Sequence, residues 1–221
     1  MMYQEADRQL TEIQNDLKRE AVKLDNTGID ELHAVGVKTV TSRLMKRLLK
    51  RNRKAYWIIA KKAFWEALEV ARKHGYTKDC DDLQEAWMLG LLDDYNYVTG
   101  YLYTPEAERK RLRLSEAINT SLSFGDRGMY HHEVKRFFNL WWTQTRQYAI
   151  DIVDGAETEA WERVGVKYAM WVTAEDEKVC EECGLRDGEI YKLDEFPPKP
   201  HYNCRCRKLP MPREYKPNKD N

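Results

Sequence analysis

The chain has 221 residues, enough to bury an independent hydrophobic core in one large domain or two small ones. Lysine and arginine number 37 and are balanced by 37 aspartate and glutamate residues, so no net charge drives binding to nucleic acid or membrane, and any electrostatic contact must be local. The apolar fraction of 42% is low and the charged fraction of 33% is high, a mixture typical of long solvated helices in an extended shape.

The N-terminus lacks the basic and then apolar run of a secretory signal. No segment approaches the roughly 18 apolar residues that are needed to span a bilayer. We therefore expect a protein that is made in a reducing cytoplasm and does not enter a membrane. In that compartment, clustered cysteines are more often metal ligands than disulfides.

The first segment predicts a helix with a narrow apolar stripe, because its apolar residues recur at spacings of three and four. The stripe consists of Tyr3, Ala6, Leu10, Ile13, Leu17 and Leu24. Asn26-Thr-Gly28 breaks this helix, and we expect residues 29–40 to form a short helix or a loop.

A long helix is predicted from Thr41 to about Gly75, and its first half is basic. Such a run is often only a solvated helical face, or it is neutralised by acidic residues elsewhere, for which residues 79–94 are the candidate. The functional alternative is contact with the phosphate backbone of nucleic acid or with an acidic partner surface. The candidate nucleic-acid-binding residues are Lys50, Arg51, Arg53 and Lys54.

The middle of the chain predicts three further helices. Residues 81–92 form one, followed by a linker at 95–103. Thr104 as N-cap and Pro105 at the first helical position begin the next. The last runs to Gly165, with a kink expected near Gly155, and its aromatic residues predict core packing rather than a binding site. They are Phe137, Phe138, Trp141, Trp142, Tyr148 and Trp161.

After Gly165 the apolar period changes from that of a helix to that of a strand. Strands are predicted at 166–172, 189–193 and 205–209, with a turn at Asp187-Gly188. The sequence therefore predicts an α+β fold. We expect a helical region at 1–165 with possible subregions 1–100 and 101–165, a β-rich module at 166–210 and a flexible tail at 211–221.

The β-rich module contains four of the five cysteines and one of the five histidines. Thiolate and imidazole are the ligands that tetrahedral zinc prefers, and a C-x-x-C pair folds as a tight knuckle that needs only one or two later donors. The sequence therefore predicts a structural zinc site, with disulfides or buried free thiols as the alternatives. The candidate metal ligands are Cys180, Cys183, His201, Cys204 and Cys206.

These motifs resemble the C-terminal signature of the Mu F-like head morphogenesis proteins of tailed bacteriophages. The resemblance rests on Trp171 to Cys183, on Asp187-Gly188 and on Pro200-His-Tyr-Asn-Cys-Arg-Cys206, and it extends upstream to about residue 95. It implies a minor head protein in the virion, inside the capsid. There it would bind the portal protein, assist assembly and DNA passage, and lie against packaged double-stranded DNA.

We expect no catalysis, because soft ligands crowded into two short motifs close the coordination shell of a metal, whereas a catalytic metal needs an open position. The alternative is a nucleic-acid-binding zinc protein or a zinc-dependent nuclease, with His201 and Asn203 as the candidate catalytic pair.

Overall fold

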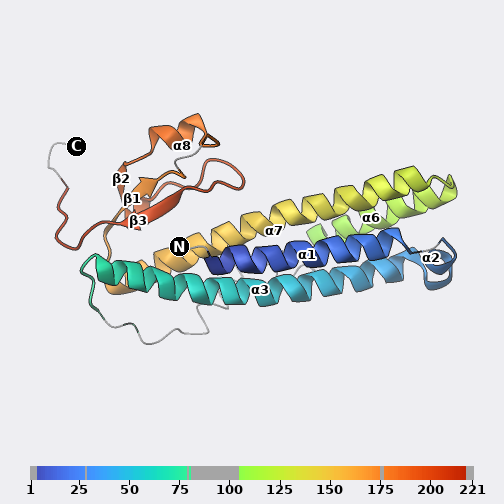
Figure 1. The fold of residues 1–221 in the computed structure, drawn as a ribbon, viewed down its shortest axis with the longest axis horizontal. Helices are drawn as coiled ribbons and strands as arrows, with labels where there is room; N and C mark the ends of the chain where they lie inside the picture. Colours follow the sequence, from blue (N-terminus) through green and yellow to red (C-terminus); the bar gives the residue numbers. More distant parts are fainter. Residues whose placement is uncertain (1–3, 28, 79, 81–104, 175–176, 218–221) are drawn as a thin grey trace.

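The computed structural model describes residues 4–27, 29–78, 80, 105–174 and 177–217. It is an elongated helical bundle with a small antiparallel sheet over one end (Figure 1). The helices of the bundle are α1 (Gln4–Asp25), α2 (Ile29–Val35), α3 (Val37–Lys73), α6 (Pro105–Ser123) and α7 (Arg127–Val164). This arrangement of helices followed by a small sheet confirms the predicted α+β class.

Helices α3 and α7 form the centre of the bundle, and α1 and α6 each pack against both of them. Four of the six aromatic residues of α7 predicted to be core residues are buried, and two are partly buried against the core: Phe138, Trp141, Tyr148 and Trp161 belong to the first group, and Phe137 and Trp142 to the second. The indole Nε1 of Trp161 donates a hydrogen bond to the backbone oxygen of Ala67, 3.0 Å away, which links α7 to α3 within the core.

Helix α7 begins and ends with the local signals that favour such boundaries. The carboxylate of Asp126 accepts a hydrogen bond from the backbone N–H of Met129 at 2.9 Å and caps the first turn. Gly165 ends the helix in the left-handed region, with φ of 85°. Between them α7 is one continuous helix, in which Gly155 causes no break.

Two predicted boundaries shift in the structure. Residues 29–40 were expected to be a short helix or a loop; they form α2 and the first turn of α3, separated by Gly36 with φ of 83°. Helix α3 therefore starts at Val37 rather than at Thr41. The helix predicted at 81–92, the linker at 95–103 and the acidic stretch at 79–94 lie outside the described residues, apart from Cys80.

The sheet consists of β1 (Tyr168–Val172), β2 (Ile190–Lys192) and β3 (Arg207–Pro210), in the order β2-β1-β3 with both pairings antiparallel. The three predicted strands are thus present, each shorter than expected. Strand β1 is central, and Met170 lies opposite Ile190 on one side and Leu209 on the other. Its alternate residues Ala169 and Trp171 are buried.

The segment after β3 contacts the rest of the molecule. The backbone N–H of Met211 donates to the oxygen of Tyr168, and that of Arg213 donates to the oxygen of His74, each at 3.0 Å. Within the part of the chain that the structure describes, no helix has the length and apolar character needed to cross a membrane.

Candidate metal centre

The first two donors lie at the start of a one-turn helix, α8 (Glu181–Leu185). Cys180 is its N-cap, and its Sγ accepts a hydrogen bond from the backbone N–H of Cys183 at 3.4 Å. The side chain of Cys183 is buried beneath the turn. The predicted C-x-x-C knuckle is therefore formed by a helix N-terminus, which turns both sulfurs to the same side.

The later donors lie in the loop that leads into β3. Asn203 adopts the left-handed conformation, with φ of 57°, and its backbone N–H donates to Oε1 of Gln147 on α7 at 2.6 Å. This turn places Cys204 and Cys206 in the interior, where they are 1% and 4% exposed. Cys206 was expected within the third strand but precedes β3, and both cysteines approach Cys183.

The five predicted ligands come together around Cys183. Its Sγ lies 3.6 Å from the Sγ of Cys204 and 3.6 Å from Nε2 of His201. A tetrahedral zinc with bonds of about 2.3 Å to sulfur has ligand-to-ligand edges of about 3.7 Å. The donor atoms form two triads that share Cys183, and within each triad all lie within 4.8 Å of one another: Cys180, Cys183 and His201, and Cys183, Cys204 and Cys206. The donor set fits zinc.

The orientation of His201 also suits a metal ligand. Its Nδ1 lies 3.0 Å from the backbone oxygen of Tyr202, to which it can donate its proton. That hydrogen bond leaves the lone pair of Nε2 directed at the sulfur cluster, as in metal sites where the second ring nitrogen of a histidine is held by a carbonyl.

The thiol chemistry of the cluster differs between its two ends. The backbone N–H of Cys183 holds the pKa of Cys180 below its ordinary value, whereas burial raises the pKa of Cys183 and of Cys206. All five cysteines of the chain are free thiols in the structure. Buried thiols of this kind become ligands only as thiolates, and a divalent cation supplies the charge that stabilises them.

Two stacked aromatic rings, those of Trp171 and Phe196, pack against the cysteine cluster. The rings of Trp171 and Phe196 are parallel within 9°, with centroids 5.6 Å apart. The guanidinium of Arg186 lies over Trp171 at 5.2 Å, and the ammonium of Lys208 lies over Phe196 at 5.7 Å. Trp171 packs directly against Cys183, Cys204 and Cys206. The module therefore has its own small core, built from the sulfur cluster and this stack.

Residues 143–209 match the family model described as Phage Mu protein F like protein. This segment is Mu F-like. The resemblance expected from the sequence is confirmed for these residues. No curated protein and no solved structure matches the chain.

The Mu F-like segment joins the C-terminal half of α7 to the cysteine and histidine module, and the structure shows extensive polar contacts between these parts. Lys199 forms an ion pair with Asp154 at 2.9 Å. Lys208 donates to the backbone oxygen of Asp154 at 2.9 Å and to the hydroxyl of Thr158. Together with the contact between Asn203 and Gln147, these bonds fix the metal centre on α7.

We did not predict this docking row, the polar residues of α7 that face the module, from the sequence. The residues of α7 that bond to the module are Gln147, Asp154 and Thr158, and Asp151 accepts a hydrogen bond from Gln147, so the four recur at spacings of four, three and four. The helical spacing of these polar residues along α7 is a signal that could have revealed it. Glu157 lies beside the row and is 1% exposed, and neither of its carboxylate oxygens has a hydrogen-bond partner within the described residues.

The candidate nucleic-acid-binding residues lie apart from the metal centre, on α3. Lys50, Arg53 and Lys54 are exposed, and no ion pair involves them within the described part of the chain. Arg51 differs, because it forms ion pairs with Glu12 at 2.9 Å and Asp16 at 2.8 Å on α1.

A second pair, between Arg47 and Glu20 at 2.7 Å, also joins α3 to α1. Helix α1 thus neutralises one edge of the basic run. The acidic segment that the sequence suggested for this role, Asp79, Asp81, Asp82, Glu85, Asp93 and Asp94, lies outside the described residues.

Proposed function

We propose that this protein is a minor head protein of a tailed phage, located inside the capsid and bound to the portal protein, where it assists assembly and DNA passage without catalysis. The observation that carries the proposal is that the Mu F-like match covers one packed unit, the second half of α7 with its metal-binding module. A rigid unit of this kind suits an anchor in a large assembly.

The metal in this proposal is a structural zinc. When bound, it crosslinks α8 to the loop before β3 and so holds the three strands together. Cys183 is central to the site, because it is buried and belongs to both donor triads. Structural zinc supplies on the order of 10 kcal/mol of folding free energy in small modules.

The nuclease alternative requires His201 to act as a base next to an open metal position. Its Nε2 instead faces the sulfur of Cys183, and its Nδ1 faces a backbone carbonyl. Both ring nitrogens are thus taken up by contacts within the module. The geometry therefore favours a structural role for His201.

Direct contact with packaged DNA is a further part of the proposal. It rests on the exposed cations Lys50, Arg53 and Lys54, whereas Arg51 is held against α1. Such contact would be independent of base sequence, because side chains that meet phosphates carry no sequence information.

A groove between α1 and α7 supports portal binding through a helix of the partner. It has a volume of about 470 Å³, and its walls include Leu17, Ala21, Phe138 and Trp142. Ion pairs close the opposite edge of α1 against α3, but this edge remains open and apolar. Val22 on its rim is 59% exposed and adds to the apolar surface of the groove.

Metal content and portal binding test the proposal together. The purified protein is expected to hold about one zinc. Cys183→Ser should lose the metal and the folded module, whereas Cys80→Ser, which removes a cysteine outside the cluster, should keep both. Co-purification with the portal oligomer of the same phage should be lost with Cys183→Ser. A metal-free native protein whose melting profile is unaffected by chelators would contradict the zinc assignment.

The groove and the DNA contact need separate tests. Val22→Asp should weaken portal binding, whereas Asn15→Asp, which adds the same charge elsewhere on α1, should not. Lys50→Glu combined with Lys54→Glu should weaken binding to duplex DNA and reduce its salt dependence by about two phosphate contacts. DNA cleavage that His201→Ala abolishes would establish the nuclease instead.

A further inference from the structure

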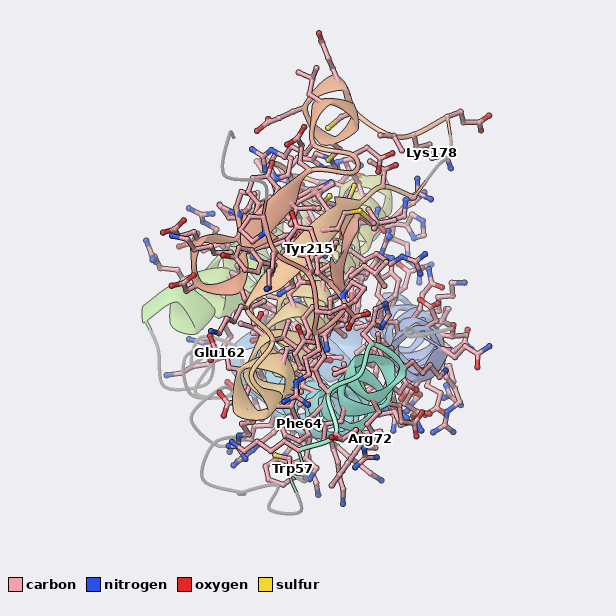
Figure 2. The ribbon with its side chains drawn as sticks, turned by 90° about the vertical axis from the view of Figure 1, so that its left-hand side faces the viewer. Trp57, Phe64, Arg72, Glu162, Lys178 and Tyr215 are labelled. Carbon is pink, nitrogen blue, oxygen red and sulfur yellow. The ribbon has the colours of Figure 1, made fainter. Side chains whose placement is uncertain are left out.

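A polar cavity of about 580 Å³ lies at the end of the bundle, away from the metal ligands. Four chain segments form it: the turn after α3, the end of α7, the start of β1 and the segment after β3. Figure 2 looks onto this end of the molecule, where Tyr215 lies between the sheet above and the labelled Glu162 and Arg72 below. The volume is within the range of sites for small ligands.

Three cations and three tyrosines line this cavity. The cations are Lys78, Lys167 and Arg213, all exposed, and no ion pair involves any of them within the described residues. Tyr76 is buried in its wall, and the rings of Tyr168 and Tyr215 meet edge to face with centroids 5.5 Å apart. The lining therefore combines positive charge with aromatic surface.

The partial negative charge of the nearby helix C-termini does not explain why Lys78, Lys167 and Arg213 gather here. Helices α3 and α7 both end here, and a helix C-terminus carries about half a negative charge, which favours nearby cations. The last turns already contain Arg72, Lys73 and Arg163. Glu214, next to Arg213, and Glu162, in the last turn of α7, add two negative charges, so the three cations of the lining still leave one positive charge in excess among these residues.

The cavity is held in shape by backbone bonds. The N–H of Arg213 donates to the oxygen of His74 at 3.0 Å, and the N–H of Tyr215 donates to the oxygen of Pro212 at 2.9 Å. The segment that contains Arg213 and Tyr215 is therefore held in place by backbone hydrogen bonds and forms one wall of the cavity. Two of the six cationic and tyrosine side chains in the lining come from it.

We propose that this cavity binds a nucleoside phosphate, with its phosphates on Lys78, Lys167 and Arg213 and its base against the tyrosine rings. Cationic side chains form strong charge-assisted hydrogen bonds with phosphate oxygens, and aromatic rings stack with any base. The same chemistry is present in a free nucleotide and in the phosphorylated end of a nucleic-acid strand.

Equilibrium dialysis of the zinc-loaded full chain with labelled ATP tests the proposal. Lys167→Ala and Arg213→Ala should each weaken binding about tenfold, the loss that removal of one charge-assisted hydrogen bond gives. Lys73→Ala removes an exposed cation from the last turn of α3, outside the cavity, and should leave binding unchanged. All three residues are exposed, so these variants should fold, as circular dichroism can verify.

Two further measurements complete the test. Tyr215→Leu should reduce the affinity for ATP towards that for inorganic tripolyphosphate, because only the base needs the ring. A short single-stranded oligonucleotide with a 5′-phosphate that binds more tightly than ATP, and more tightly than its 5′-hydroxyl form, would identify a strand end as the ligand; the reverse order would identify a free nucleotide. No binding of either, or equal weakening by Lys73→Ala, would overturn the proposal.

Discussion

Glu157 offers a sharp test of how the metal-binding module docks on α7. Its carboxyl is buried with no hydrogen-bond partner in the described structure, and burial raises its pKa above the ordinary value of 4.5. The charged groups that face it are Asp154 on α7, Lys199 in the loop before the metal ligands, and Arg207 and Lys208 on β3. The cations lower the pKa, but the cost of burial is the larger effect.

The sign of the pH dependence follows from proton uptake. Above pH 4.5 the unfolded chain loses the proton of Glu157, whereas the folded protein keeps it until the raised pKa is reached. The folded state therefore binds more protons, and its free energy of unfolding falls as the pH rises, by up to about 1.4 kcal/mol per pH unit. This contribution to stability is complete at low pH and is lost above the folded pKa.

Glu157→Gln keeps the shape of the side chain and removes its titration. Urea unfolding of the zinc-loaded protein at pH 5, 6 and 7 should show the variant gaining stability relative to the native chain by about 1.4 kcal/mol per unit. All other groups are common to both proteins, so the difference reports on Glu157. Glu162→Gln, an exposed carboxylate on the same helix, should show no such trend. A difference that is constant from pH 5 to 7 would refute the argument.

Three further predictions concern the helices. Asp126→Ala removes the cap of α7 and should lower the free energy of unfolding by about 1 kcal/mol, measured by urea denaturation. Gly165→Ala should cost about 1 kcal/mol in the same assay for backbone strain alone, because a Cβ at this position would meet no atom within 4 Å. Arg51→Ala should raise the mobility of α1, seen as faster hydrogen exchange of its backbone amides near Asp16, whereas Arg53→Ala should not.

The helices and the sheet were predictable because each follows from a local pattern. The stripe that predicted the first helix has the period of α1, and Gly165 marks the change from helical to strand spacing. The segment at 29–40 was ambiguous because Gly36 divides it, and neither half is long enough to show a full apolar period. The exact start of α3 depends instead on burial of Val37 and Thr41 in the bundle.

The grouping of the five candidate donors was predictable for the same reason. Cys180 and Cys183 are three residues apart, and the later donors also lie within one short motif, so ligand spacing indicates which side chains come together, and their binding of a metal stays a prediction. The backbone that presents them was not predictable in detail. Cys204 and Cys206 approach Cys183 because Asn203 takes a left-handed turn and bonds to Gln147, which is 56 residues away in sequence.

Contacts between distant segments explain what sequence reasoning missed. Lys199 and Lys208 bond to α7 across 45 and 54 residues, and nothing near either lysine in sequence names its partner. The same holds for Arg51, whose carboxylate partners are on α1. A run of charged residues on a helix therefore identifies candidate ligand-binding residues. Only the packing of the helix against its neighbours shows which of them form ion pairs and which are available to a ligand.

The docking row also suggests why the Mu F-like match begins within a helix. A module of three short strands has little apolar surface to bury, and its own core consists of the sulfur cluster and the stack of Trp171 on Phe196. Part of its stability must come from α7, which supplies Gln147 and Asp154 as bonding partners, and the proposed zinc would add to it. The match starts at residue 143, just before Gln147, the first residue of α7 that bonds to the module. The second half of α7 and the module therefore form one packed unit.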